Sequence, residues 1–265
     1  MHAITDHEFA QFQRFIYESA GISLSTGKKA LVSGRLARRL EQTQATSYAD
    51  YFRLLASGKA PQEVQTAIDL LTTNETYFFR EPKHFDFLRK QLEAFPTSQP
   101  LRIWSAAGST GEEAYSIAML LEDCRGPNPW EVVASDISMR VLQRARAGHY
   151  PMERARNVPR DYLQRFCLKG EGAQEGTLLV QKALREKVKF LQVNLNEQLP
   201  NLGLFDFVFL RNVLIYFNSD TKRHVIHRCA SVLKPGGWLM IGHSESLHGI
   251  NDSLQSVVPS IYRKP

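Results

Sequence analysis

The chain has 265 residues, of which 43% are hydrophobic and 23% are charged, a composition typical of a folded protein with one or two domains. It excludes a disordered, collagen-like or coiled-coil protein, and no apolar run approaches the ~20 residues that span a bilayer. Lys and Arg outnumber Asp and Glu by 33 to 27, giving a net charge of +6, which favours an acidic partner.

The first 75 or so residues predict helices only. Apolar residues recur at helical spacing from Phe9 onward, and no alternating β-branched run interrupts them. Four helices are expected: one ending at Gly21, then residues 28–41, 48–56 and a fourth that opens at Pro61. This part of the chain is therefore predicted to form a small all-helical domain.

From about residue 100 short apolar runs alternate with helical stretches. The runs are residues 101–105, 131–135, 188–193, 205–210 and 237–242. Strands interleaved with helices predict right-handed βαβ units and a parallel sheet. The rhythm breaks after residue 150, where three glycines and a short apolar run at 178–180 indicate an insertion, either a small antiparallel hairpin or a subdomain.

The three cysteines and the N-terminal residues indicate the cellular compartment of the protein. Cys124, Cys167 and Cys229 form no C-x-x-C pair, so neither a disulfide framework nor a zinc site is expected. The N-terminus lacks the basic and apolar stretches of a signal peptide. We therefore expect a cytoplasmic protein with reduced thiols.

Residues 103–116, IWSAAGSTGEEAYS, are the most informative segment. A strand is expected to end at Ser105, and small residues then lead into a helix, at the sheet edge where open α/β folds bind ligands. The loop is neither G-x-G-x-x-G nor a P-loop. In place of a lysine it carries Glu112 and Glu113, which favour a cationic ligand over a triphosphate. A tight turn with acids in the first helical turn explains the loop equally well.

Asp136 ends the next predicted strand, 23 residues after Glu113 (136 − 113). An acid at about this spacing accepts hydrogen bonds from a ribose diol. The alternative is the N-cap of a helix beginning at Ile137, a common role of Asp. Together Glu113 and Asp136 indicate a site for an adenosine that carries a positive centre, S-adenosylmethionine.

Three more stretches complete a recognisable pattern: LLTTNETYFFRE (70–81), FDFVFLRNVLIYF (205–217) and LKPGGWLMIGHSE (233–245). With the loop and strand end above, they closely resemble the bacterial chemotaxis receptor methyltransferases, the CheR family. The resemblance covers essentially the whole chain. One departure is Ala114, where the family commonly has a proline that the first helical turn does not require.

The resemblance implies an α/β fold of the class I methyltransferase type: a Rossmann-like, mostly parallel sheet with helices on both faces. It implies an all-helical N-terminal domain over residues 1–75 that docks the receptor and covers the cofactor site. A methyltransferase domain would follow over 76–265, with a small antiparallel β-subdomain inserted at about 151–187.

The activity implied by the resemblance is methyl transfer from S-adenosylmethionine to glutamate side chains of chemoreceptors, which yields methyl esters and S-adenosyl-L-homocysteine without a metal. The implied cofactor contacts are Asn74, Thr76, Arg80, Glu113, Asp136, Asn194, Leu195, Arg211 and Asn212. Asn194 and Leu195 would bracket the adenine. Arg80 and Tyr216 would lie beside the transferring methyl group.

The chemistry of this transfer is consistent with these residues. A carboxylate nucleophile is already ionised at neutral pH, so no strong general base is needed, and the site must mainly position two groups in line and exclude water. Arg80 can bind a carboxylate through two parallel hydrogen bonds, and the Tyr216 hydroxyl can fix its second oxygen or line the methyl path.

Less specific interpretations remain for several of these side chains. Arg80 could simply pair with Glu75 or Glu81 at the surface, and Tyr216 could belong to the core. The sequence His243-Ser244-Glu245 lacks a G-x-S-x-G elbow and is interpreted as a turn. A metal site is not expected at the cluster of His224, His227 and Cys229, which lacks a fourth ligand.

A basic stripe marks the second predicted helix: Lys28, Arg35, Arg38 and Arg39. Such a stripe is usually a solvated face, but it also resembles the family's receptor-docking helix, which would align an acidic helical receptor. Nucleic acid would be attracted by the same charges. A nucleic-acid methyltransferase and a non-catalytic cofactor-binding module are therefore the rival hypotheses, although no Asn/Asp-Pro-Pro-Tyr motif is present.

The inserted subdomain suggests a second contact. In some members of the family it adds a strand to a short peptide at the receptor's C-terminus. Residues 170–181 stand where that subdomain would be. Neither nucleic-acid binding nor membrane insertion is expected.

Overall fold

Four helices form the N-terminal part of the structure, a computed structural model that describes residues 3–265. They are α1 (Asp6–Ala20), α2 (Lys29–Thr43), α3 (Tyr48–Ala56) and α4 (Pro61–Leu71), with a 3-10 turn η1 (Thr26–Lys28) before α2. Thr5 and Glu8 cap α1 reciprocally, each side chain accepting from the other's backbone N–H. Phe12 of α1 packs against Tyr48 and Tyr51, so an aromatic cluster holds α1 to α3.

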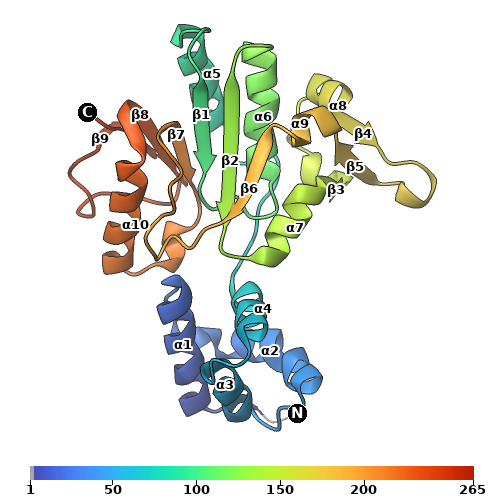
Figure 1. Cartoon of the computed structure of the whole chain (residues 1–265), viewed down its shortest axis with the longest axis vertical. Helices are drawn as coiled ribbons and strands as arrows, with labels where there is room; N and C mark the ends of the chain where they lie inside the picture. The colour runs from blue at the N-terminus through green and yellow to red at the C-terminus, as the bar shows by residue number, and fades with distance from the viewer. Residues whose placement is uncertain (1–2) are drawn as a thin grey trace.

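A seven-stranded sheet has the order β6-β2-β1-β7-β8-β10-β9. Its strands are β1 (Leu101–Ser105), β2 (Trp130–Asp136), β6 (Val188–Gln192), β7 (Phe205–Leu210), β8 (Leu233–Ile241), β9 (Gln255–Val258) and β10 (Ile261–Arg263). The first five in this order are parallel (Figure 1), and β10 and β9 pair antiparallel at one edge. The strand order reverses between β1 and β7, and ligands of open α/β sheets bind at the strand ends beside such a reversal.

Helices cover both faces of this sheet. Trp104 and Val208 pack in one hydrophobic cluster with α1–α4 and α10 (Ser219–Ser231). Ile103 and Phe207 pack in a second cluster with α5 (Lys83–Ala94) and α6 (Glu112–Arg125). Successive strand residues point to opposite faces, and parallel strands need both faces covered. Among residues 3–265, no helix has the length and apolar content needed to cross a membrane.

A second, smaller sheet is inserted after α7 (Met139–Ala147). Its three antiparallel strands have the order β3-β5-β4 and lie to the side of α6 and α7 in Figure 1. The elements of this insertion are β3 (His149–Pro151), η2 (Met152–Ala155), α8 (Arg160–Phe166), β4 (Cys167–Lys169), η3 (Gly172–Gln174), β5 (Thr177–Val180) and α9 (Lys182–Arg185).

The fold class predicted from the sequence is confirmed, with two differences in the strands. β8 begins at Leu233, before the Pro-Gly-Gly sequence, and its pairing with β7 shifts register between Phe205 and Phe207. β9 and β10 were not predicted. All four residues of β9 are exposed, so no buried alternation marks this strand in the sequence.

Candidate active site

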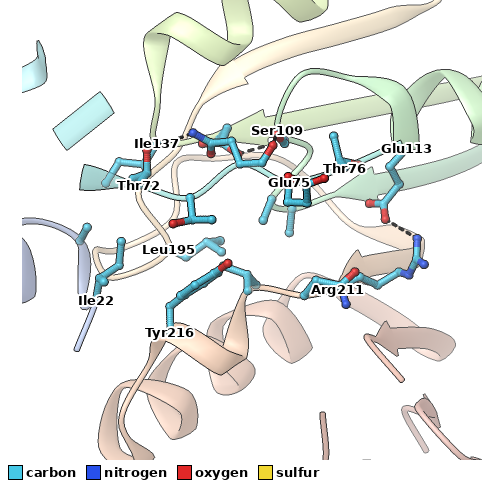
Figure 2. A pocket seen from close by; sticks show the side chains of 18 of the residues that line it. Ile22, Thr72, Glu75, Thr76, Ser109, Glu113, Ile137, Leu195, Arg211 and Tyr216 are labelled. Carbon is cyan, nitrogen blue, oxygen red and sulfur yellow. Dashed lines mark hydrogen bonds and ion pairs between the residues drawn. The ribbon is translucent and has the colours of Figure 1, made fainter. Parts of the chain in front are cut away.

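A pocket of about 840 Å³, open solvent included, lies at the carboxyl ends of β1, β2 and β7 (Figure 2). Its upper wall is the α4–α5 connection, residues 72–82. All nine predicted cofactor contacts and Tyr216 line it: Asn74, Thr76, Arg80, Glu113, Asp136, Asn194, Leu195, Arg211, Asn212 and Tyr216. Segments that are distant in the chain therefore meet at one cavity.

Glu113 and Arg211 form a buried ion pair inside this pocket. Nη1 of Arg211 lies 2.6 Å from Oε2 of Glu113, and the Arg211 side chain is 1% exposed. Ser105 donates to the other oxygen of Glu113 at 2.7 Å. The pair thus joins the end of β7 to the first turn of α6, and Figure 2 shows it at one end of the cavity.

Arg211 also holds the α4–α5 connection. Its Nη2 donates to the carbonyl oxygen of Arg80 and, at 3.0 Å, to Oε2 of Glu81. Two further donors reach this connection: Ser109 Oγ to the carbonyl of Asn74 at 3.0 Å and Arg154 Nη1 to that of Thr76 at 2.7 Å. The wall is therefore fixed at three backbone carbonyls and at the Glu81 side chain.

Asp136 is the last residue of β2 and is almost wholly buried at the pocket's edge. Its carboxylate accepts from the backbone N–H of Ser109 at 3.0 Å and of Ser138 at 2.9 Å. Burial, with a smaller contribution from Asp69, raises its pKa to about 6. The N-cap of α7 is Ser138, and the helix begins at Met139, so the alternative of Asp136 capping a helix from Ile137 does not hold.

Asn194 and Leu195 form the far wall together with the end of α1. Nδ2 of Asn194 donates to the carbonyl of Ser19 at 2.8 Å, which brings Ala20 and Ile22 to the pocket. These two residues were not predicted, and no local pattern marks them because the contact that brings them here joins Asn194 to Ser19, 175 positions away. Ile137 also lines the pocket, and its place directly after the strand-end acid could have identified it.

Arg80 and Tyr216 both line the cavity. Nη1 of Arg80 donates to the carbonyl of Glu75 at 2.8 Å, and its guanidinium lies 5.8 Å from the Tyr77 ring centroid. Its side chain thus makes no ion pair with Glu75 or Glu81. Tyr216 ends the 3-10 turn η4 (Leu214–Tyr216), and Figure 2 shows its hydroxyl directed into the pocket.

Glu245 organises the loop that carries Asn212 and Tyr216. Its partly buried carboxylate accepts from the backbone N–H of Gly242 at 2.6 Å, Asn212 at 3.0 Å and Ile215 at 3.2 Å. Asn212 has φ 57°, a left-handed conformation that an ordered surrounding must maintain. The turn expected at 243–245 therefore positions the pocket's lower wall, a role that was not predicted.

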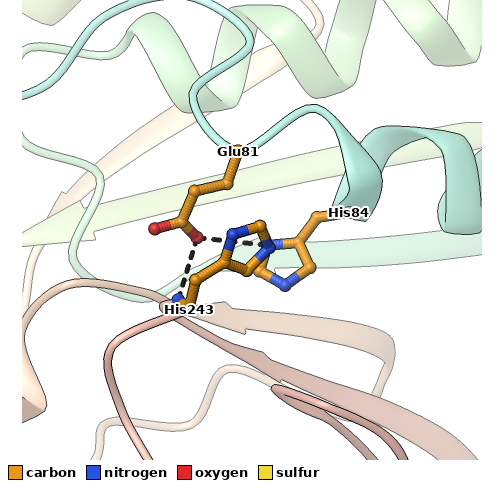
Figure 3. A group of neighbouring side chains, drawn as sticks. All are labelled: Glu81, His84 and His243. Carbon is orange, nitrogen blue, oxygen red and sulfur yellow. Dashed lines mark hydrogen bonds and ion pairs between the residues drawn. The ribbon is translucent and has the colours of Figure 1, made fainter.

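Glu81, His84 and His243 each offer a ligand atom within 4.8 Å of the others (Figure 3). Within residues 3–265 this is the single such group found. The carboxylate oxygen in this group, Oε2 of Glu81, already accepts hydrogen bonds from Arg211 and, at 3.2 Å, from the backbone N–H of His243. Burial and the nearby Arg211 lower the pKa of His84 to about 3, so His84 is neutral. The Glu81 carboxylate is ion-paired with Arg211, and we assign no metal to this group.

His224, His227 and Cys229 lie on one helix but differ in exposure. All three lie on α10, where both histidines are exposed and Cys229 is fully buried in the core. Their side chains consequently face different surroundings.

The four basic residues of α2 and its preceding turn have different surroundings. Lys28 and Arg38 are exposed. Arg35 donates to the carbonyls of Leu71 and Thr72 at 2.9 and 3.1 Å, and Arg39 pairs with Glu63. Arg35 therefore anchors the end of α4 next to the pocket, while Lys28 and Arg38 remain free to meet a partner.

The pocket's residues fit an adenosine that carries a positive charge. The pocket-lining set contains no lysine, two arginines and three acids, Glu75, Glu113 and Asp136. One of the arginines, Arg211, is paired with Glu113. Small side chains at Ala106, Ala107 and Ser109 leave the backbone open to close approach, and strand-end acids of this kind hold ribose hydroxyls. Fold and site together define a class I S-adenosylmethionine-dependent methyltransferase.

Comparison with known proteins identifies the family within this class of methyltransferases. Residues 74–262 match the model "CheR methyltransferase, SAM binding domain", and residues 7–72 match "CheR methyltransferase, all-alpha domain". The chain belongs to the CheR methyltransferase family.

Individual relatives are similar over nearly the whole chain. The chemotaxis protein methyltransferase of Escherichia coli K12 is 43% identical over 92% of this chain and 86% of its own. Chemotaxis protein methyltransferase 2 of Pseudomonas aeruginosa is 42% identical over 97% and 93%. The solved structure of TrmN from Thermus thermophilus covers 69% of this chain and 47% of its own, with a TM-score of 0.41 and 15% identity.

Proposed function

We propose that the protein methylates glutamate side chains of chemoreceptors, using S-adenosylmethionine and forming methyl esters. The observation that carries this proposal is the convergence of Arg80, Tyr216 and the buried Glu113–Arg211 pair on one pocket. The names of the curated relatives, chemotaxis protein methyltransferases, support the receptor as substrate.

The pocket's residues divide into two groups by role. Asp136 would accept the ribose hydroxyls, and Asn194 and Leu195 would hold the adenine. Asn74, Thr76 and Glu113 would bind the methionine portion, whose sulfonium supplies an electrophilic methyl group. The pairing with Arg211 would keep the Glu113 carboxylate oriented, because Ser105 and Arg211 bond its two oxygens from the protein side.

The substrate carboxylate would be oriented by Arg80 with help from Tyr216. A glutamate is ionised at neutral pH, so these residues need not remove a proton. Their task is to align an oxygen with the methyl group and to exclude water. An arginine suits this because its fork matches the two oxygens of a carboxylate. Because an anion and a cation become neutral during the transfer, a poorly hydrated pocket does not oppose the reaction.

Docking of the receptor is proposed at the helical part, residues 1–75, with the methyltransferase chemistry in residues 76–265. Lys28 and Arg38 are exposed and would attract an acidic helical bundle. Arg35 and Arg39 would add to the positive electrostatic potential of this surface without contacting the receptor directly, because their guanidiniums already bond protein groups. The β-subdomain is proposed to receive a receptor C-terminal peptide along the free edge of β4.

The test is transfer of labelled methyl from S-adenosylmethionine to a receptor signalling fragment. We expect base-labile label on the fragment, as an ester requires, and none on a fragment with the acceptor glutamates changed to glutamine. Equal labelling of transfer RNA, or base-stable label on the fragment, would contradict the proposal.

A further inference from the structure

The inserted β-sheet region reaches the cofactor pocket through one side chain, Arg154. Arg154 lies in η2, directly after β3. Its Nη1 donates both to the carbonyl oxygen of Thr76, at 2.7 Å, and to Oε1 of Glu112, at 2.9 Å. Thr76 lines the cofactor pocket, and Arg154 lines a separate surface groove on the other side of the α4–α5 connection. The connection is thus held from behind by a residue of the insertion.

Glu112 anchors Arg154 from the cofactor loop. Its side chain is 0% exposed, and its second oxygen accepts from Thr110 at 2.6 Å. Burial raises its pKa, while Arg154 and Thr110 oppose the rise. A buried carboxylate with these two partners holds the guanidinium in one place. In the sequence Glu112 is distinguished only as one of two loop acids.

Two further contacts join the same elements. The N–H of Phe78 donates to the carbonyl of Arg154 at 3.2 Å. Tyr150 of β3 packs edge-on against Phe78, with centroids 5.1 Å apart, and donates to the carbonyl of Thr110 at 2.7 Å. The insertion therefore touches both the cofactor loop and the connection, and Arg154 is the charged link between them.

We propose that Arg154 is a positioning residue for methyl transfer, which holds Thr76 at the cofactor and joins the inserted β-sheet region to the active site. The inference rests on the proposed function, in which Thr76 contacts the methionine portion of the cofactor. Arg154 acts through the backbone of Thr76 and contacts neither reacting atom. The opposite end of the connection is held separately, by Arg211 at the carbonyl of Arg80.

The experiment compares Arg154→Ala with the double variant Glu112→Gln/Arg154→Ala. In the single variant the KM for S-adenosylmethionine and the Kd for S-adenosylhomocysteine should rise about tenfold, while kcat changes less than threefold because Arg80 stays held. Its Tm should also fall, since Glu112 is left buried and unpaired. In the double variant the Tm should recover because no buried charge remains, but the KM and Kd should stay raised. Arg154→Lys, which keeps one donor, should lie between wild type and Arg154→Ala.

Arg156→Ala is the matched control, because Arg156 is exposed, two residues away, and lines the same outer groove. Its KM and Tm should equal those of the wild type. The inference is overturned if Arg154→Ala leaves KM within twofold, or if the double variant restores KM together with Tm, since Arg154 would then be merely structural. Failure of the wild-type protein itself to bind S-adenosylhomocysteine would instead refute the proposed function.

Discussion

Arg211 and Glu113, 98 positions apart in the chain, meet at 2.6 Å in the buried wall of the cofactor pocket. The same guanidinium reaches Glu81 and the carbonyl of Arg80. One side chain thus fixes the end of β7, the start of α6 and the α4–α5 connection relative to each other. This wall of the pocket is therefore held together by the Arg211 guanidinium.

Removal of Arg211 should destabilise the fold as well as the site. Arg211→Ala leaves Glu113 and Glu81 buried without their common partner, and breaking a buried ion pair typically costs about 3–5 kcal/mol. We expect the free energy of unfolding, measured by urea denaturation, to fall by about 3 kcal/mol. Arg53→Ala, at an exposed ion pair with Asp50, is the control and should cost less than about 1 kcal/mol. Similar losses in the two variants would contradict the assigned role.

Cofactor affinity should depend on pH through Asp136. Its pKa of about 6 lies above the ordinary 3.8 because the group is buried. Only the carboxylate accepts both ribose hydroxyls, so the Kd for S-adenosylhomocysteine should rise as pH falls through 6, approaching tenfold per unit. Isothermal titration calorimetry between pH 5 and 8 measures this. Asp136→Asn should bind weakly at every pH, and a persisting pH dependence in that variant would assign it to another group.

The raised pKa of Asp136 has the opposite consequence for folding. The folded chain holds this proton more tightly than the unfolded chain between about pH 4 and 6. Stability from this group is therefore fully present below the unfolded pKa and is lost as pH rises through 6. In the absence of cofactor, Asp136→Asn should raise the Tm at pH 8 more than at pH 5.

Much of this arrangement follows from sequence patterns, and the reasons are local. Buried parallel strands appear as apolar runs, so β1 and β7 have their predicted bounds. Glu113 and Asp136 could be placed because a strand end followed by small residues or an acid marks the ligand edge of such a sheet.

What escaped prediction depends on contacts between distant residues. Arg39 is an ordinary basic residue in the sequence, and its partner Glu63 lies 24 positions away on another helix. Glu245 resembled a turn residue because its acceptor role requires β8 and the loop after β7 to be adjacent. Exposed β9 joins the sheet only through β10.

Asp69 should tie the helical part to the methyltransferase fold. From α4 its carboxylate accepts from the N–H groups of Met139 and Arg140, at 3.0 and 3.2 Å, at the start of α7. Losing such a cap costs about 1–2 kcal/mol. Asp69→Ala should lower the free energy of unfolding by this amount and weaken S-adenosylhomocysteine binding a few-fold. Glu41→Ala, at an exposed residue of α2, should do neither. Equal binding by the two variants would show that Asp69 does not support the pocket.

Glu245 should act on turnover through the loop after β7. Glu245→Ala leaves three N–H groups without their acceptor, so Asn212 and Tyr216 lose their position. We expect kcat to fall at least tenfold, because misplacement of a positioned group by about 1 Å is costly. Steady-state methyl transfer measures this. Ser244→Ala, at the exposed neighbouring residue, should retain the wild-type kcat, and a Glu245→Ala enzyme with normal kcat would show that Glu245 does not position the loop for turnover.

The most direct test is single-turnover methyl transfer by Arg80→Ala at saturating S-adenosylmethionine, together with its Kd for S-adenosylhomocysteine. If Arg80 orients the acceptor carboxylate, the rate should fall at least a hundredfold, the usual effect of removing one preorganised donor, while the Kd changes less than tenfold. A rate within threefold of the wild type, or a Kd that weakens as much as the rate falls, would contradict a pocket in which Arg80 aligns the acid with the methyl group.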